Sequence, residues 1–346
     1  MSVALQPRVV VADDSAFMRQ LLSKALAEGG FDVVAVVADG DAALAACDAY
    51  RPDVLSLDLA MPGAHGLDVL RALSSALSPI RVVVVSAFSP AYGARAVDAL
   101  AEGAFELVAK PANGSGLTAF LEELVEKMTL AAGARAARPV SVATRAVLAS
   151  RARPTTGSHP DRVVVIACST GGPRALAELV PHFPERLGKG TLIVQHMPAG
   201  FTGSLAERLD RASKLNVREA TGGEALDPST AVLARGGSHL RFQRGTIALT
   251  DDDPVGGLRP RADLTIRDVA DAFGSDLVLV VLTGMGRDGL DGAEEVKRRG
   301  GRVLVEAEST CTVYGMPRAI VEAELADTVL PLDQLPDAIV EEANAR

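Results

Sequence analysis

Three side chains in the second half of the chain have the chemistry of an activated nucleophile. Ser169 follows the apolar segment VVVIAC, His196 follows TLIVQ, and Asp288 lies in the loop TGMGRDG after LVLVVL. A serine hydroxyl attacks poorly until a neutral imidazole removes its proton, and a carboxylate behind the imidazole fixes its tautomer and stabilises the imidazolium. Glycines around Ser169 and Met285 would let backbone amides approach an oxyanion. These residues therefore point to acyl-transfer chemistry.

Each of these residues also has a simpler interpretation. Ser169 stands before Gly-Gly-Pro and could cap a helix, and Asp288 could be an ordinary turn residue. His239 rivals His196 as the base, but we prefer His196 because it directly follows an apolar strand segment. Cys168 is interpreted as a small core residue rather than a nucleophile, since no separate base accompanies it.

A second group of polar residues lies at the ends of apolar segments in the first half. Asp13 and Asp14 follow RVVVA, Asp58 follows VLSL, and Ser86 and Lys110 end two later segments. Neighbouring carboxylates repel one another unless a cation joins them, and Mg²⁺ prefers such hard oxygen ligands. A hydroxyl and an ammonium nearby would complete a phosphoryl site. Helix capping explains each residue singly, but not five such groups at the ends of four strands.

Short apolar strands and helix-like stretches alternate through the first half of the chain. The expected strands cover residues 8–12, 33–38, 54–57, 81–85 and 107–109. The expected helices cover residues 17–27, 41–49, 67–73, 92–100 and 117–128. Five such units predict a doubly wound, flavodoxin-like (βα)5 parallel sheet. The carboxyl ends of its strands would gather the acidic residues along one edge.

A second α/β pattern follows. Its expected strands cover residues 162–168, 191–195, 231–234, 276–282, 302–305 and 328–330, with a β-hairpin at 239–242 and 246–249. Its expected helices cover residues 173–179, 201–212, 264–272, 290–299 and 318–324. We predict an α/β domain with a mainly parallel sheet and one hairpin. The same edge rule would bring Ser169, His196 and Asp288 together.

The 346-residue chain is long enough for two domains. Residues 131–160 break the alternation, and they carry five arginines and no acidic residue. We therefore expect domains over residues 1–130 and 161–346, joined by a linker over 131–160 in which 142–149 could form a short helix. The basic character of this linker favours a solvated segment over a site for an anionic partner.

Composition excludes several classes of function. The net charge of −9 argues against a general nucleic-acid binder. Cys47, Cys168 and Cys311 are scattered without a CxxC pair, so neither a disulfide framework nor structural zinc is expected. No apolar segment approaches the roughly 20 residues of a membrane span, and the N-terminus has no signal pattern. We expect a cytoplasmic protein without membrane insertion.

The first half resembles the two-component receiver family. The resemblance rests on ADDSAFMR, LDLAMPGAHGLDVL, VSA and KP, and it covers the first expected domain almost completely. It implies that Asp58 accepts a phosphoryl group from a chemotaxis-type sensor histidine kinase. It also implies that Asp13 and Asp14 hold Mg²⁺ together with Asp58. Ser86 and Lys110 would contact the phosphoryl oxygens.

The second half resembles the chemotaxis protein-glutamate methylesterase family, CheB. The segments ACSTGGPRAL, QHMPAGFTGSLAERL, LTGMGRDGLDG and VYGMPRAIVEA occur in the family's order. The resemblance implies Ser169 as the nucleophile, His196 as the general base and Asp288 as the residue that orients it. The backbone amides of Met285 and Thr170 would stabilise the oxyanion, and no cofactor is expected in this domain.

Together the two resemblances imply a phosphorylation-regulated serine hydrolase of two-component chemotaxis signalling. Its substrates would be methyl-accepting chemotaxis receptors, whose glutamate methyl esters it would hydrolyse to methanol and glutamate. The same apparatus could deamidate receptor glutamines. Two alternatives stay open: a phosphorylation-controlled binding module whose hydrolase half is inactive, and a receiver-linked hydrolase that acts on another ester or amide.

The sequence departs from the family patterns at several positions. The methylesterase family has Ser where Arg261 stands and Gln where Glu306 stands. The other departures are at Arg235, Ala307, Leu107, Ala60 and His65. We expect those in the second domain to rim the active-site cleft and to alter receptor preference more than the chemistry. In the receiver, Leu107 replaces a common aromatic switch residue.

Overall fold

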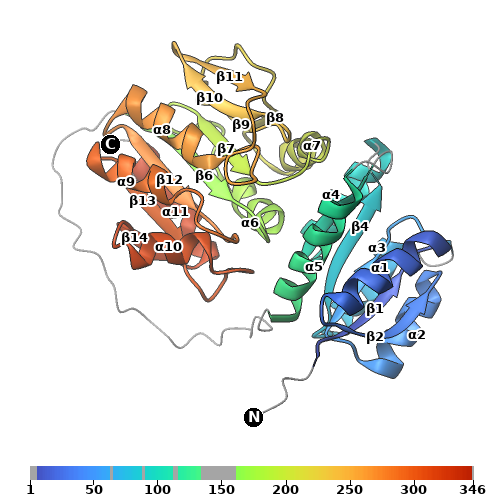
Figure 1. Cartoon of the computed structure of the whole chain (residues 1–346). Helices are drawn as coiled ribbons and strands as arrows, with labels where there is room; N and C mark the ends of the chain where they lie inside the picture. The colour runs from blue at the N-terminus through green and yellow to red at the C-terminus, as the bar shows by residue number, and fades with distance from the viewer. Residues whose placement is uncertain (1–5, 63–64, 88–89, 112–115, 134–160, 345–346) are drawn as a thin grey trace. The chain divides into compact units, whose positions relative to one another are not determined.

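The computed structural model describes residues 6–62, 65–87, 90–111, 116–133 and 161–344. The chain divides into two compact units, residues 1–136 and 137–346 (Figure 1). Most of the predicted linker over 131–160, with its possible helix at 142–149, lies outside the described residues. Its first residues belong to the last helix of the first unit, and the predicted domain limits stay predictions.

The first unit is a parallel five-stranded sheet with the order β2-β1-β3-β4-β5. Its strands are β1 (Arg8–Ala12), β2 (Asp32–Val37), β3 (Val54–Leu57), β4 (Arg81–Ala87) and β5 (Glu106–Lys110). Its helices are α1 (Ala16–Glu28), α2 (Gly40–Tyr50), α3 (Gly66–Ser75), α4 (Pro90–Ala101) and α5 (Leu117–Gly133). The strand order reverses between β1 and β3, which is where open α/β sheets form their crevice.

The second unit contains a seven-stranded parallel sheet with the order β14-β13-β12-β6-β7-β9-β8. Its strands are β6 (Val163–Cys168), β7 (Thr191–Gln195), β8 (Asn216–Glu219), β9 (Thr230–Leu233), β12 (Leu277–Val281), β13 (Arg302–Glu306) and β14 (Thr328–Leu330). An antiparallel hairpin joins β10 (His239–Gln243) and β11 (Thr246–Thr250). The predicted fold class is confirmed in both units.

Helices of the second unit alternate with its strands. They are α6 (Gly172–Leu179), α7 (Thr202–Ala212), α8 (Ala262–Phe273), α9 (Leu290–Arg298), α10 (Met316–Glu322) and α11 (Leu335–Ala343), with short 3-10 helices η1 (Val180–His182) and η2 (Leu332–Gln334). Helices α8 and α9 are in close contact. A side chain at Gly292 of α9 would lie only 2.8 Å from Ile266 of α8, so this position has no room for one. The two helices that flank the Asp288 loop therefore pack against each other.

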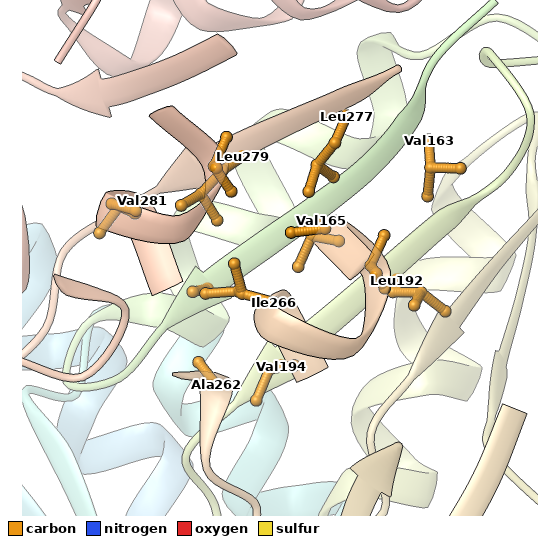
Figure 2. Packing of buried hydrophobic residues seen from close by; sticks show 14 of the residues in the cluster. Val163, Val165, Leu192, Val194, Ala262, Ile266, Leu277, Leu279 and Val281 are labelled. Atoms are coloured by element: carbon orange, nitrogen blue, oxygen red, sulfur yellow. The ribbon is translucent and has the colours of Figure 1, made fainter. Parts of the chain in front are cut away.

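Aliphatic side chains form the core of the second unit. Val165, Leu279 and Val281 of β6 and β12 are completely buried, and Ile266 of α8 lies against them (Figure 2). These strands are apolar on both faces, as expected of central parallel strands that are covered on two sides. The core fixes the relative positions of β6, β7 and β12, whose carboxyl ends carry the predicted triad.

Among the strands and α-helices, β8 and α11 were not predicted from the sequence. Strand β8 reads NVRE, and only Val217 of it is buried, because it lies at the edge of the sheet and pairs with β9 alone. Helix α11 follows the last strand and also escaped prediction. In the described part of the chain, no helix has the length and apolar character to cross a membrane.

Leu279→Ala should lower the free energy of unfolding of the second unit by about 2–5 kcal/mol, because it removes buried contacts and leaves a cavity. Denaturant titration followed by circular dichroism measures this. The control is Val255→Ala, at a residue that is 43% exposed, which should change little. A loss at position 279 no larger than that of the control would contradict the described packing.

Candidate functional site

The candidate active site lies at the carboxyl edge of the three central strands of the second unit. Strand β6 pairs with β12 on one side and with β7 on the other, and Cys168 is in register with Gln195. Ser169 follows Cys168 and His196 follows Gln195, so the two predicted catalytic residues begin at neighbouring strand ends. The His196 amide donates to the Cys168 carbonyl at 3.1 Å, and the Ser169 amide donates to the Thr283 carbonyl at 3.0 Å.

Gln195 holds the serine and histidine loops together. Its buried side-chain amide donates to the carbonyl oxygens of Ser169 at 3.0 Å and His196 at 2.9 Å, and its oxygen accepts from the Cys168 thiol at 3.0 Å. A side chain at Gly172 would lie 2.0 Å from that oxygen, so this position needs glycine. Gln195 thus fixes the backbone beneath the predicted nucleophile and base.

The structure brings His196 and Asp288 into direct contact. His196 Nε2 lies 2.7 Å from Asp288 Oδ2, and both side chains are almost completely buried. A carboxylate only accepts, so Nε2 carries the proton and Nδ1 keeps the lone pair that a general base needs. The Ser169 hydroxyl makes no hydrogen bond to His196 in the described residues. Nucleophile–base contacts often close only around substrate.

Backbone donors surround the Asp288 carboxylate. It accepts from the amides of Ala262 at 2.7 Å, Asp263 at 2.9 Å and Gly289 at 3.0 Å. Burial acts to raise the pKa of Asp288, but the hydrogen bond and charge of His196 and the amides of Ala262 and Asp263 outweigh it and hold the pKa well below its usual range. Asp288 is therefore ionised at neutral pH and can orient His196.

The loop after β12 is fastened to the serine loop through Thr283. The Thr283 hydroxyl donates to the Thr170 carbonyl at 2.9 Å and accepts from the Val313 amide at the same distance. A side chain at Gly284 would lie 2.8 Å from Ser169 Cβ, so the two loops are in close contact. The proposed binding of an oxyanion by the Thr170 and Met285 amides, which belong to these two loops, stays a prediction.

In the first unit, the three predicted acidic residues gather at the switch point of the sheet. One oxygen each of Asp13, Asp14 and Asp58 lies within 4.8 Å of the other two. Lys110 Nζ lies 2.7 Å from both Asp13 Oδ2 and Asp58 Oδ2. Burial raises the pKa of Asp13 despite the bonds and charge of Lys110. This all-oxygen group fits a hard divalent cation.

Ser86 is the last residue but one of its strand, and not the last as was predicted. It is buried within β4, which continues to Ala87, and Ala87 is in register with Lys110. Its hydroxyl donates to the Ala87 carbonyl at 3.4 Å. The strand is longer than expected because β5 pairs with it through its last residue.

Comparison with known proteins matches both units. The family model described as CheB methylesterase covers residues 164–339, and the response regulator receiver domain covers residues 9–122. The chain belongs to the CheB methylesterase family. It is accordingly an enzyme of the carboxylic-ester hydrolase class that carries a receiver domain, and the predicted family and enzyme class are confirmed.

Similar proteins cover almost the whole chain. A protein-glutamate methylesterase/protein-glutamine glutaminase of Myxococcus xanthus is 43% identical over 340 residues, 96% of this chain and 97% of its own. That of Symbiobacterium thermophilum is 41% identical over 347 residues, 96% of each chain. The solved CheB methylesterase catalytic domain of Thermotoga maritima is 42% identical, with a TM-score of 0.51, and it covers 53% of this chain and 99% of that domain.

Two of the departures from the CheB pattern contact residues of the candidate site. Arg261 Nε lies 2.8 Å from Asp288 Oδ1, so it directly contacts a residue of the predicted triad. Glu306 is completely buried, and its Oε2 accepts from the Thr283 amide at 2.7 Å. The expectation of a position at the rim of the cleft was wrong for Glu306, because its side chain is completely buried. Arg235 is exposed.

The rival residues lie in other surroundings. His239 is buried in the hairpin strand β10, where its Nε2 contacts the Asp253 carbonyl at 3.2 Å. Burial raises the pKa of the Cys168 thiol, so little reactive thiolate is present. Sequence reasoning missed the roles of Gln195 and Arg261. A polar residue that ends an otherwise apolar strand was the available signal for Gln195.

Gly284→Ala should lower kcat for ester hydrolysis by about a hundredfold, because the added methyl group displaces Ser169 or the loop after β12. Steady-state kinetics with a methyl ester substrate measures this. Gly203→Ala in α7 is the control, since a side chain there would make only ordinary van der Waals contacts, with Glu219. Equal rates for the two variants would show that the close approach of these loops is not needed.

Proposed function

We propose that this chain hydrolyses glutamate methyl esters on chemoreceptors, with Ser169 as the nucleophile, His196 as the general base and Asp288 as its orienting carboxylate. The observation that carries this proposal is the buried His196–Asp288 hydrogen bond, on the strand next to Ser169, in a chain of the CheB methylesterase family. The names of the relatives supply the substrate class, which is the side-chain ester or amide of a protein glutamate or glutamine.

The reaction proceeds through an acyl-enzyme. Ser169 Oγ attacks the ester carbonyl while His196 Nδ1 takes its proton, and the oxyanion accepts hydrogen bonds from the Met285 and Thr170 amides. The C–O bond then breaks, and His196 returns the proton to the departing methoxy group, which leaves as methanol. Water, deprotonated by His196, cleaves the acyl-enzyme to glutamate and regenerates Ser169. A glutamine amide would follow the same steps and release ammonia.

The receiver controls this reaction through Asp58, which accepts a phosphoryl group from a chemotaxis-type histidine kinase. Asp13, Asp14 and Asp58 would hold Mg²⁺, which neutralises charge on phosphoryl oxygens. Lys110 already bridges two of these carboxylates and would turn to the phosphoryl oxygens, together with Ser86. Such a local change needs only a two-state element to reach the methylesterase domain.

The receiver spans residues 1–130, the linker 131–160 and the methylesterase domain 161–346. The enzyme acts in the cytoplasm on methyl-accepting receptors, without nucleic-acid partners or membrane insertion. Relatives named protein-glutamate methylesterase/protein-glutamine glutaminase match the chain over both domains, and Ser169, His196 and Asp288 are all present, which favours this function over a binding module whose hydrolase half is inactive.

Ser169→Ala should lower methanol release from methyl-labelled receptor fragments by at least about 10⁴-fold, and His196→Ala should cost about as much, because triad members act as a unit. His239→Ala should lower methanol release only as far as the loss of a buried side chain destabilises the fold, since His239 lies in the hairpin. Released methanol is measured in each case. Full activity of Ser169→Ala would refute the mechanism, and wild-type activity on simple esters alone would favour another substrate.

Asp58→Asn should retain the basal rate and lose stimulation by a small phosphodonor with Mg²⁺, because an amide cannot accept the phosphoryl group at this position. Asp53→Asn is a matched control at a residue before β3, and it should still respond. Methanol release with and without phosphodonor is compared. Stimulation of Asp58→Asn equal to that of the wild type would exclude Asp58 as the phosphorylation site.

A further inference from the structure

We propose that Arg261 is a positioning residue, whose guanidinium holds Asp288 and Asp263 together as carboxylates behind His196 and so extends the action of the base to lower pH. This inference rests on the proposed function, because it concerns the same His196–Asp288 pair.

The guanidinium contacts both carboxylates at once. Its Nε lies 2.8 Å from Asp288 Oδ1, and its Nη2 lies 2.6 Å from Asp263 Oδ2. The Arg261 side chain is 20% exposed, whereas those of Asp288 and Asp263 are 1% and 4% exposed. A planar, permanently charged fork suits such a double contact in a partly dry setting better than an ammonium group.

The two carboxylates need a cation between them. Asp263 Oδ1 accepts from the amides of Gly289 and Gly292, both at 2.9 Å, at the start of α9, while Asp288 accepts from the amides at the start of α8. Each carboxylate thus fastens a helix end. Burial and the charge of Asp288 raise the pKa of Asp263, which is the expected result of two like charges in one buried place.

The outer side of the guanidinium is covered by a short turn. Arg261 Nη1 lies 3.4 Å from the Val255 carbonyl, and a side chain at Gly256 would lie 2.8 Å from the same nitrogen. This glycine has a φ of +59°, in the left-handed region. The turn thereby limits the movement of the guanidinium away from Asp288.

Two other charged side chains near Arg261 and Asp288, Arg267 and Arg287, are exposed. Helix α8 contributes Arg267, which pairs with Asp291 of α9 at 2.9 Å, and both of these side chains are exposed. Arg287, next to Asp288 in the chain, is also exposed. Arg261 contacts Asp288 directly and binds Asp263 through the same guanidinium, so both charges can act on the His196 imidazole through Asp288.

The two charges should act on His196 in opposite directions. The positive charge of Arg261 opposes protonation of the imidazole, so that the neutral base persists to lower pH. The negative charge of Asp263 favours protonation. Removing Arg261 should therefore move the acid limb of kcat/KM to higher pH, and removing the charge of Asp263 should move it to lower pH.

The test compares Arg261→Ser, Asp263→Asn and Arg267→Ser in the full chain. The acid limb of kcat/KM for methyl ester hydrolysis should move up by on the order of half a pH unit in Arg261→Ser and down in Asp263→Asn. Arg267→Ser, which breaks an exposed pair between α8 and α9, should leave it unchanged. Arg261→Lys keeps the charge and should stay near the wild-type limb even where kcat falls.

NMR titration of the His196 ring in the same proteins gives a readout that needs no substrate. Its signal is identified by its loss in His196→Gln, and its midpoint should move as the acid limb does. Unmoved midpoints, or midpoints that move in the same direction in Arg261→Ser and Asp263→Asn, would overturn the inference while ester hydrolysis stands. Opposite shifts without methyl ester hydrolysis by the wild type would support the inference and refute the proposed function.

Discussion

The packing of the methylesterase domain depends on compensating the charge of one carboxylate that is almost completely buried, Asp288. A buried charge such as Asp288 costs several kcal/mol unless hydrogen bonds and opposite charges compensate it. The compensation comes from His196 and Arg261, and from amides at the starts of α8 and α9. These partners lie on separate segments, which can meet only when the sheet and both helices are packed. The fold and the predicted triad therefore depend on the same interaction.

The two sites manage repulsion between carboxylates in different ways. In the receiver, Lys110 stands between Asp13 and Asp58, and in the methylesterase domain Arg261 stands between Asp263 and Asp288. A lysine ammonium is a mobile point charge that can follow an arriving phosphoryl group, whereas a guanidinium fixes geometry. The receiver site is thus built to change, and the hydrolase site is built to hold one arrangement.

Local sequence patterns predicted most of the fold. The features that were missed depend on contacts between residues far apart in the sequence. Apolar runs predicted both sheets because central parallel strands are buried on two faces, but β8 is an edge strand with one buried residue and gives no such signal. The strand-end rule likewise predicted that His196 and Asp288 meet. It could not predict Arg261, because nothing in the residues around position 261 indicates which distant carboxylate its side chain reaches.

The departures from the family differ in whether they change charge. Glu306 stands where the resemblance places Gln, and burial raises its pKa despite the Thr283 amide. A carboxyl group is close to a glutamine amide in size, and its Oε2 accepts from the Thr283 amide as a glutamine oxygen could. Arg261 is permanently charged and contacts Asp288. Of these two departures, Arg261 is therefore the one that adds a permanent charge beside Asp288.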